Sequence, residues 1–309
     1  WQGPTEASEA TGLLPWLAQP ALAELGTAMP CLWDRARLQA WPAAPTEALG
    51  ASGGQLVDAA DVPAGQPGST PWPAGPRWFS GDWYLAPPGK PNVAQAASRQ
   101  RALQLLQMVG EDADTHLLED VFRHDAALSY QLLRLVNSVA MGSRREITSF
   151  GQAILLLGRQ QLKRWLNLLL FAARDDDERS AMLMARVSLR ARGMELLAQA
   201  AGLDRHGQDQ AFMTGMFSML GVLFGTPLGE MLRTIRVTDT LHAALIDHQG
   251  ELGALLTTWE TVERADRAGT AAQLARWSVS ADTFNTLLLQ ACGWVLHLTQ
   301  ESLAHGRPA

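Results

Sequence analysis

The chain has 309 residues, which is enough for two domains with buried cores. It is 47% hydrophobic and 18% charged, a composition that is ordinary for a soluble globular protein. The formal net charge of −6 argues against non-specific nucleic-acid binding as the main function, although it leaves room for a local basic patch.

The chain contains only two cysteines, Cys31 and Cys292, which lie far apart in the sequence. Neither has a nearby histidine or second cysteine, so we expect two small buried side chains and a reducing compartment rather than a disulfide or a metal site. No signal-peptide pattern and no uninterrupted apolar run of about 20 residues occurs. We therefore expect a cytoplasmic protein without membrane insertion.

Residues 1–95 differ in composition from the rest and form the first expected domain. Fourteen of the 16 prolines and seven of the 11 tryptophans lie there. So much proline excludes a helical bundle, and so many aromatic residues are unusual in a disordered linker, so we expect a compact, turn-rich domain with short strands. The expected elements are a helix over 13–25 interrupted by Pro15 and Pro20, strands at 55–57 and 83–85, and a loop over 64–75.

Residues 96–309 form the second expected domain. Apolar residues recur there at helical spacing, which predicts an all-helical bundle. The expected helices cover 96–109, a segment starting near Asp112 or Asp114, 125–141, 149–158, 159–173, 179–201 and 281–303.

Several motifs occur in a fixed order along this second domain. They are Asp-x-x-Leu-Ser from Asp125, Leu-Leu-Arg-x-x-Asn-Ser from Leu132, Ile-Thr-Ser from Ile147, Arg-Ala-x-x-x-Glu-x-x-Ala from Arg190 and Gly-x-Phe-Ser-x-Leu from Gly215. Together they resemble the HDOD domain, an all-helical bacterial signalling module, over about residues 96–304. The resemblance implies a fold similar to that of the HD-type metal phosphohydrolases.

The run from Gly215 to Gly221 aligns with the Gly-Leu-Leu-His-Asp-Ile-Gly segment of the metal-binding HD proteins. In those proteins the His and Asp bind the metal and activate water. Here Ser218 and Met219 occupy the two positions, and a thioether is a poor ligand for hard divalent ions. We expect a degenerate HD motif at Ser218 and Met219, no catalytic residues, no metal and no cofactor.

The segment from Arg77 to Pro87 resembles the last strand and turn of an EAL domain, a cyclic-di-GMP phosphodiesterase barrel. Residues 1–95 are too few to form an eight-stranded barrel, and no motif supplies its metal-binding carboxylates. The resemblance therefore implies a small, irregular α/β remnant of an EAL-like domain in front of the HDOD bundle.

Polar residues at helix ends form a second candidate site, a surface for a partner or ligand. Solvated side chains that serve only the helix ends are the alternative interpretation. The residues are Arg134, Asn137, Arg144, Arg145, Arg159, Lys163 and Arg164.

The preferred interpretation is a non-catalytic bacterial regulatory protein that binds protein partners through its HDOD domain, with a link to cyclic-di-GMP, motility or stress signalling. Binding of cyclic-di-GMP itself is compatible with this but not expected. One alternative is a nucleotide or nucleic-acid binder that uses the basic residues above. The other is a metal-dependent phosphohydrolase with His116, His124 and Asp125 in an unusual site.

Overall fold

The structure of the chain is a computed structural model. It describes residues 14–28, 32–39, 43–52, 55–58, 81–86, 93–123, 158–160, 162–164, 166–168, 170, 178–235 and 237–304. The chain divides into two compact units, residues 1–84 with 260–309 and residues 85–259. The expected boundary near residue 95 stays a prediction.

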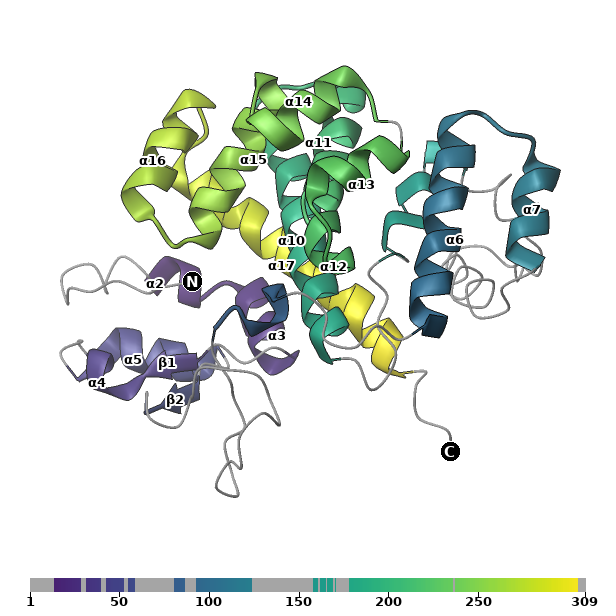
Figure 1. Ribbon diagram of the computed structural model, residues 1–309. Coiled ribbons are helices and arrows are strands. Elements are labelled where there is room, and N and C mark those ends of the chain that lie inside the picture. The colour runs from purple at the N-terminus through teal and green to yellow at the C-terminus, as the bar shows by residue number, and fades with distance from the viewer. Residues whose placement is uncertain are drawn as a thin grey trace. The chain divides into compact units, whose positions relative to one another are not determined.

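The first unit combines the N-terminal segment with the last helices of the chain (Figure 1). β1 and β2 pair in parallel, with Trp33 opposite Leu56, and α4 and α5 connect them. Helix α3 packs against α17. The elements are α2 (Leu14–Leu17), α3 (Pro20–Ala28), β1 (Leu32–Asp34), α4 (Arg35–Leu38), α5 (Ala43–Ala51), β2 (Gln55–Val57), α16 (Arg267–Arg276) and α17 (Ala281–Ala304).

In this unit, prolines lie in the first turns of helices as well as at positions that interrupt them. Pro20 is the first residue of α3, and Pro15 and Pro45 lie in the first turns of α2 and α5. A first-turn residue needs no N–H for the helix, so proline is tolerated there. The predicted interruption is confirmed before Pro20 and is wrong at Pro15, which lies within α2. The segment also holds more helix than its proline content led us to expect.

The two strand predictions had different outcomes. The strand at Gln55–Val57 is confirmed as β2. The strand at Trp83–Leu85 is wrong, because these residues form the 3₁₀ turn η3 (Trp83–Leu85). Its two aromatic rings contact each other edge to face, with centroids 5.9 Å apart. Successive side chains of a strand point to opposite faces and cannot do this. The loop predicted over 64–75 lies outside the described residues.

The second unit is helical at every element that the structure describes, which confirms the mainly helical fold class. The predicted 179–201 and 281–303 helices are observed as α10 and as α17 of the first unit, and the 96–109 helix is observed as α6. The described residues between 158 and 170 are helical too, whereas the helices predicted over 125–141 and 149–157 lie outside the described residues. The elements are α6 (Val93–Gly110), α7 (Thr115–Arg123), α10 (Glu178–Ala200), α11 (Arg205–Phe217), α12 (Leu220–Phe224), α13 (Leu228–Ile235), α14 (Asp239–Asp247) and α15 (Gly250–Glu263), of which the last crosses the border between the units.

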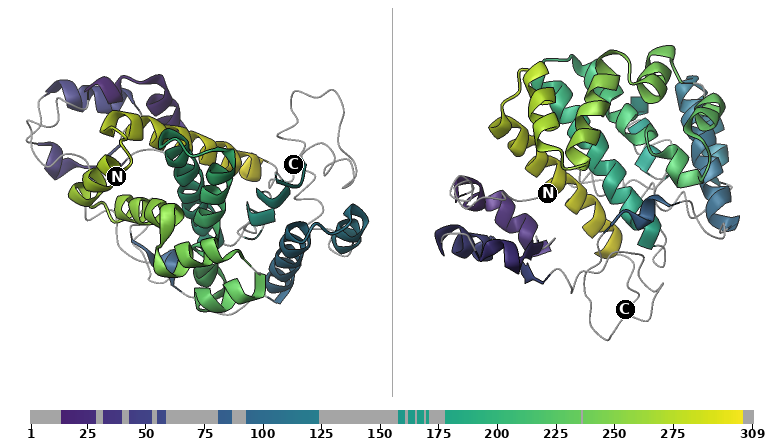
Figure 2. Two further views of the ribbon diagram at one scale, coloured as in Figure 1. Left: turned by 90° about the horizontal axis from the view of Figure 1, so that it is seen from above. Right: turned by 60° about the vertical axis from the view of Figure 1, so that its left-hand side comes forward.

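Helices α10 and α11 form the centre of this unit and lie side by side in both views of Figure 2. Leu183, Val187, Ala191 and Met194 bury one stripe of α10, at the three- and four-residue spacing of an amphipathic helix. Opposite Ala191 stands Gly215, where a Cβ atom would lie 2.5 Å from the Ala191 Cα atom. The two backbones can approach this closely only because Gly215 has no side chain.

A second close contact joins α10 to α15. The Trp259 ring, 1% exposed, lies directly over Gly193, so that any Cβ at this position would overlap the ring. Two glycines, Gly215 on α11 and Gly193 on α10, thus allow α10 to approach two neighbouring helices closely.

We expect Gly215→Ala to lower the free energy of unfolding of this unit by about 1–3 kcal/mol, because the new methyl group has no space against Ala191. Urea unfolding followed by circular dichroism measures the effect. Gly229→Ala in α13 is the matched control, since its Cβ meets only the Ile246 Cδ1 atom at 3.8 Å, and it should change stability by less than about 1 kcal/mol. Equal effects of the two substitutions would show that the helices do not depend on this contact.

Candidate functional site

The degenerate HD motif lies at the junction between α11 and α12. Ser218 is the C-cap of α11, and its backbone N–H donates to the Thr214 carbonyl at 3.0 Å. Met219 is the N-cap of α12, with φ −109° and ψ 6° and no side-chain hydrogen bond to the helix. Gly225 ends α12 in the left-handed conformation. The two motif positions therefore lie where one helix ends and the next begins.

The side chain of Arg190, on α10, contacts this junction. Its Nη1 atom donates to Ser218 Oγ at 2.7 Å, and Ser218 Oγ donates to the Gly215 carbonyl at 2.7 Å. Arg190 is only 8% exposed. A hydrogen bond from a charged donor in such a place contributes more than one between neutral groups.

The residues at this junction do not fit the divalent metal ion that the HD resemblance implies. A divalent cation needs carboxylate, imidazole or water ligands. The junction instead offers the hydroxyl of Ser218, the thioether of Met219, which is 3% exposed, and the positive charge of Arg190. Across the described parts of the chain, no group of three or more His, Cys, Asp or Glu residues is placed to hold a metal ion.

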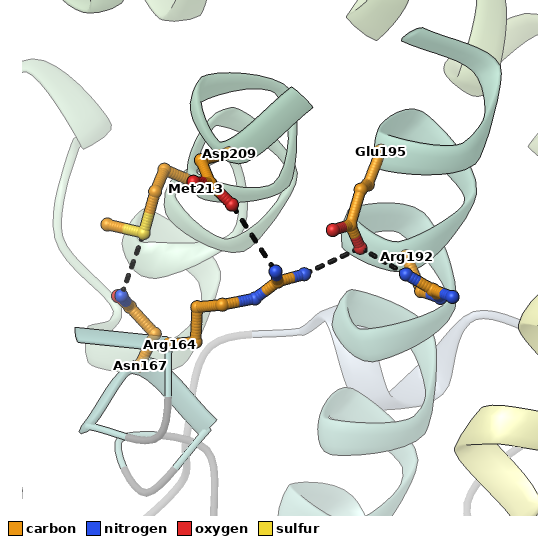
Figure 3. Close-up of polar contacts among 6 residues, drawn as sticks. All are labelled: Arg164, Asn167, Arg192, Glu195, Asp209 and Met213. Carbon is orange, nitrogen blue, oxygen red and sulfur yellow. Dashed lines mark hydrogen bonds and ion pairs between the residues drawn. The ribbon is translucent and has the colours of Figure 1, made fainter. Parts of the chain in front are cut away.

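A network of charged side chains joins α10, α11 and the helical residues around 164 (Figure 3). Arg164 Nη2 lies 2.6 Å from Glu195 Oε2, and its Nη1 lies 3.3 Å from Asp209 Oδ1. Arg192 Nη1 lies 2.6 Å from the same Glu195 oxygen. The Arg164 guanidinium also lies over the Phe212 ring, with Cζ 4.1 Å from the ring centroid. Two cations and two anions thus neutralise one another.

Burial makes this network different from a surface ion pair. The Glu195 side chain is 5% exposed and the Arg164 side chain 14% exposed. Next to it, the Asn167 amide donates to Met213 Sδ at 3.1 Å (Figure 3). The same amide also donates to the Lys163 carbonyl at 2.8 Å. The bond to Lys163 lies within the 158–170 segment, and the bond to Met213 connects that segment to α11.

The basic residues predicted as an interaction surface have different roles where they are described. Arg164 lies inside the network. Arg159 lies 3.6 Å from Asp112 and donates to the Ala113 carbonyl at 2.6 Å, so it holds the connection between α6 and α7. Lys163 lies over the end of α6, beside Gly110.

Other residues of the candidate sites cannot be placed. Arg134, Asn137, Arg144 and Arg145 of the predicted surface lie outside the described residues, and so do His124 and Asp125 of the metal alternative. His116, the third residue of that alternative, is exposed on α7. The interaction surface as a whole therefore stays a prediction.

The sequence analysis did not select Arg190 or Glu195 as site residues, although both belong to the Arg-Ala-x-x-x-Glu-x-x-Ala motif. In the structure, Arg190 binds Ser218, Ala191 faces Gly215, and Glu195 centres the ion-pair network. The available signal was that both residues lie among the apolar positions of this helix, where charged side chains are almost always paired.

The part of the chain that the structure describes contains no helix with the length and apolar character needed to cross a membrane. The unit at residues 85–259 is thus a helical domain, and Ser218 and Met219 lie between two of its helices beside Arg190.

The comparison with known families agrees with this class. The chain belongs to the HDOD family, because the HDOD domain matches residues 97–261, just over half of its length. This confirms the predicted HDOD domain; no comparison shows an EAL-like region.

Two curated relatives match parts of the chain. It is 28% identical over 222 residues to "Cyclic di-GMP phosphodiesterase CdgJ" of Vibrio cholerae, covering 72% of the chain and 51% of that protein. It is 27% identical over 161 residues to "Uncharacterized protein YuxH" of Bacillus subtilis, covering 52% of the chain and 39% of that protein. The chain thus matches about half or less of each relative's length. No solved structure matches it significantly.

We expect Glu195→Ala to lower the free energy of unfolding by about 1–3 kcal/mol, because the partly buried Arg164 and Arg192 lose their shared carboxylate and Arg164 keeps only Asp209. Chemical denaturation measures the loss. Glu251→Ala, at an exposed position in the first turn of α15, is the control and should change stability by less than about 0.5 kcal/mol. A loss at Glu195 no larger than at Glu251 would contradict a stabilising role for the network.

A second prediction concerns metal binding. We expect the double variant Ser218→His with Met219→Asp to bind Mn²⁺ only weakly while Arg190 is present, because two unit charges about 4 Å apart repel by about 4 kcal/mol at an effective dielectric constant of 20. Adding Arg190→His removes that charge and supplies a third ligand, so the triple variant should bind Mn²⁺ at least about tenfold more tightly. Calorimetry with Mn²⁺ on both folded variants measures the difference. Equal affinities would mean that Arg190 does not occupy the metal position.

Proposed function

We propose that the chain is a non-catalytic regulatory protein that acts by binding protein partners through its HDOD domain. The main support for this proposal is the junction of α11 and α12. There Arg190 donates a hydrogen bond to Ser218, and these two side chains do not form a set of metal ligands. A scaffold role needs a rigid domain rather than a reactive site. The buried charge network and the close contact at Gly215 supply that rigidity.

We further propose that the pathway involves cyclic-di-GMP and that the protein works in the cytoplasm. Support comes from the relative whose name describes it as a cyclic-di-GMP phosphodiesterase, although that activity belongs to the relative and the chain covers only 51% of it. Motility and stress regulation are the processes implied by the HDOD resemblance.

An EAL-like origin of residues 1–95 belongs to the same proposal. The motif from Arg77 to Pro87 supports it, and so does the parallel pairing of β1 with β2 across α4 and α5, since a strand-helix-strand unit is the repeating element of a barrel. The 3₁₀ turn at Trp83–Leu85, in place of the expected strand, speaks against it. One such unit occurs in many folds, so the likeness is an analogy only.

The nucleotide or nucleic-acid alternative has less support. It depends on a group of exposed cations, whereas Arg164 is 14% exposed and paired with two carboxylates, and Arg159 is paired with Asp112. A basic residue already neutralised inside the protein adds little to phosphate binding.

We expect the purified chain with Mn²⁺ or Mg²⁺ to hydrolyse no cyclic-di-GMP above background, and Ser218→Ala to give the same result, because no step depends on that hydroxyl. Nucleotide chromatography measures the product. Calorimetry on the same sample should detect no heat of cyclic-di-GMP binding.

Turnover that rises with protein concentration and disappears in Ser218→Ala would overturn the non-catalytic role. Binding heat without turnover would instead identify a receptor. On the partner side, cross-linking followed by mass spectrometry of the chain isolated from its native cells should find intermolecular links that begin within residues 97–261. Links that begin only outside that range would place partner binding elsewhere.

A further inference from the structure

The first turn of α10 connects two distant parts of the chain through one side chain. Arg179 donates from Nε and Nη2 to the Ala86 carbonyl at 2.9 and 2.6 Å, and its Nη2 also donates to the Val222 carbonyl at 2.8 Å. Ala86 directly follows η3 and comes before α6. Val222 lies in α12, just past the degenerate HD motif. One guanidinium therefore holds both backbone segments.

Arg179 does not act alone on α12. Arg190 lies eleven residues further along α10, which is about three helical turns and so the same face of the helix. It holds Ser218, and Arg179 holds Val222. We define residues 218–222 as the junction and Leu85–Ala86 as the connector. The junction is thus fastened to α10 at both of its ends by arginine side chains.

The first turn of α10 is also bound by a side chain of α6. Arg99 of α6 donates from Nη2 to the Ser180 hydroxyl at 2.7 Å and from Nε to the Leu170 carbonyl at 3.1 Å. Ser180 is 1% exposed. The backbone next to Arg179 is therefore held in place by α6. If the contacts of the Arg179 side chain change, the start of α10 does not shift to compensate.

We propose that Arg179 couples the connector to the junction, so that release of one loosens the other. A long arginine side chain loses rotamer freedom when it is ordered, and whichever carbonyl orders it first lowers the cost of binding the second. Such coupling is reciprocal by thermodynamic necessity. A signal that displaces the chain at Ala86 is passed to the α11–α12 junction, and binding at the junction is passed back to the connector. This inference concerns contacts within one unit and goes beyond the proposed scaffold role.

Hydrogen–deuterium exchange of the full chain tests the coupling. The peptides to follow cover 81–86, the junction with its continuation to 226, and 252–259 in the core of α15 as a reference. Arg179→Ala should accelerate exchange in the first two peptides about tenfold, equivalent to about 1.4 kcal/mol, and leave the reference unchanged. Arg190→Ala should accelerate the junction peptide by a similar factor and the connector peptide by less.

Two further variants make the test decisive. Arg205→Ala, at an exposed position in α11, is the control and should change none of the three peptides. Arg179→Lys keeps the charge but cannot span both carbonyls as the guanidinium does, so it should accelerate both peptides by a smaller factor, even if the alanine variant fails to fold. Acceleration of only one of the two peptides, or of all three equally, would overturn the coupling.

Discussion

The close contact between α10 and α11 at Ala191 and Gly215 is the constraint on which the domain depends. Because the two backbones meet there, the positions on either side have fixed partners. Arg190, one residue before Ala191, reaches Ser218, three residues after Gly215. Glu195, one turn further along α10, meets Arg164. Two motifs that are separate in sequence are thus the two sides of a single helix contact.

The same contact explains how the domain retains its shape with a degenerate HD motif. A metal held between neighbouring helices is a cross-link as well as a catalyst. In this chain the link from α10 to the end of α11 consists of the hydrogen bond from Arg190 to Ser218 and that from Ser218 to Gly215. The bond from the charged Arg190 contributes about 1.5–3 kcal/mol and the neutral bond from Ser218 about 0.5–1.5 kcal/mol, and neither depends on an ion from solution.

Helices of both units, such as α10 and α17, could be predicted because amphipathic spacing is a local property. The conformation of Trp83–Leu85 was predicted wrongly, because two adjacent β-favouring aromatic residues contact each other edge to face there instead of pairing with a neighbouring strand. The role of Arg164 could not be predicted in the same way, since its partners Glu195 and Asp209 lie 31 and 45 positions away. A basic turn in the sequence identifies the charged residues, but it does not identify the acidic residues that pair with them.

That distinction bears on where partners would bind. Counting arginines along the 158–170 segment overstates its positive surface, because the charge of Arg164 is cancelled inside the domain. The buried charges instead stabilise one arrangement of α10, α11 and the 158–170 segment, since any other arrangement would leave a carboxylate or guanidinium unpaired away from water. The charges of Arg164, Glu195 and Asp209 are paired with one another, so they contribute little to recognition at the surface. Exposed side chains around this core are therefore the better place to look for the chemistry of a partner.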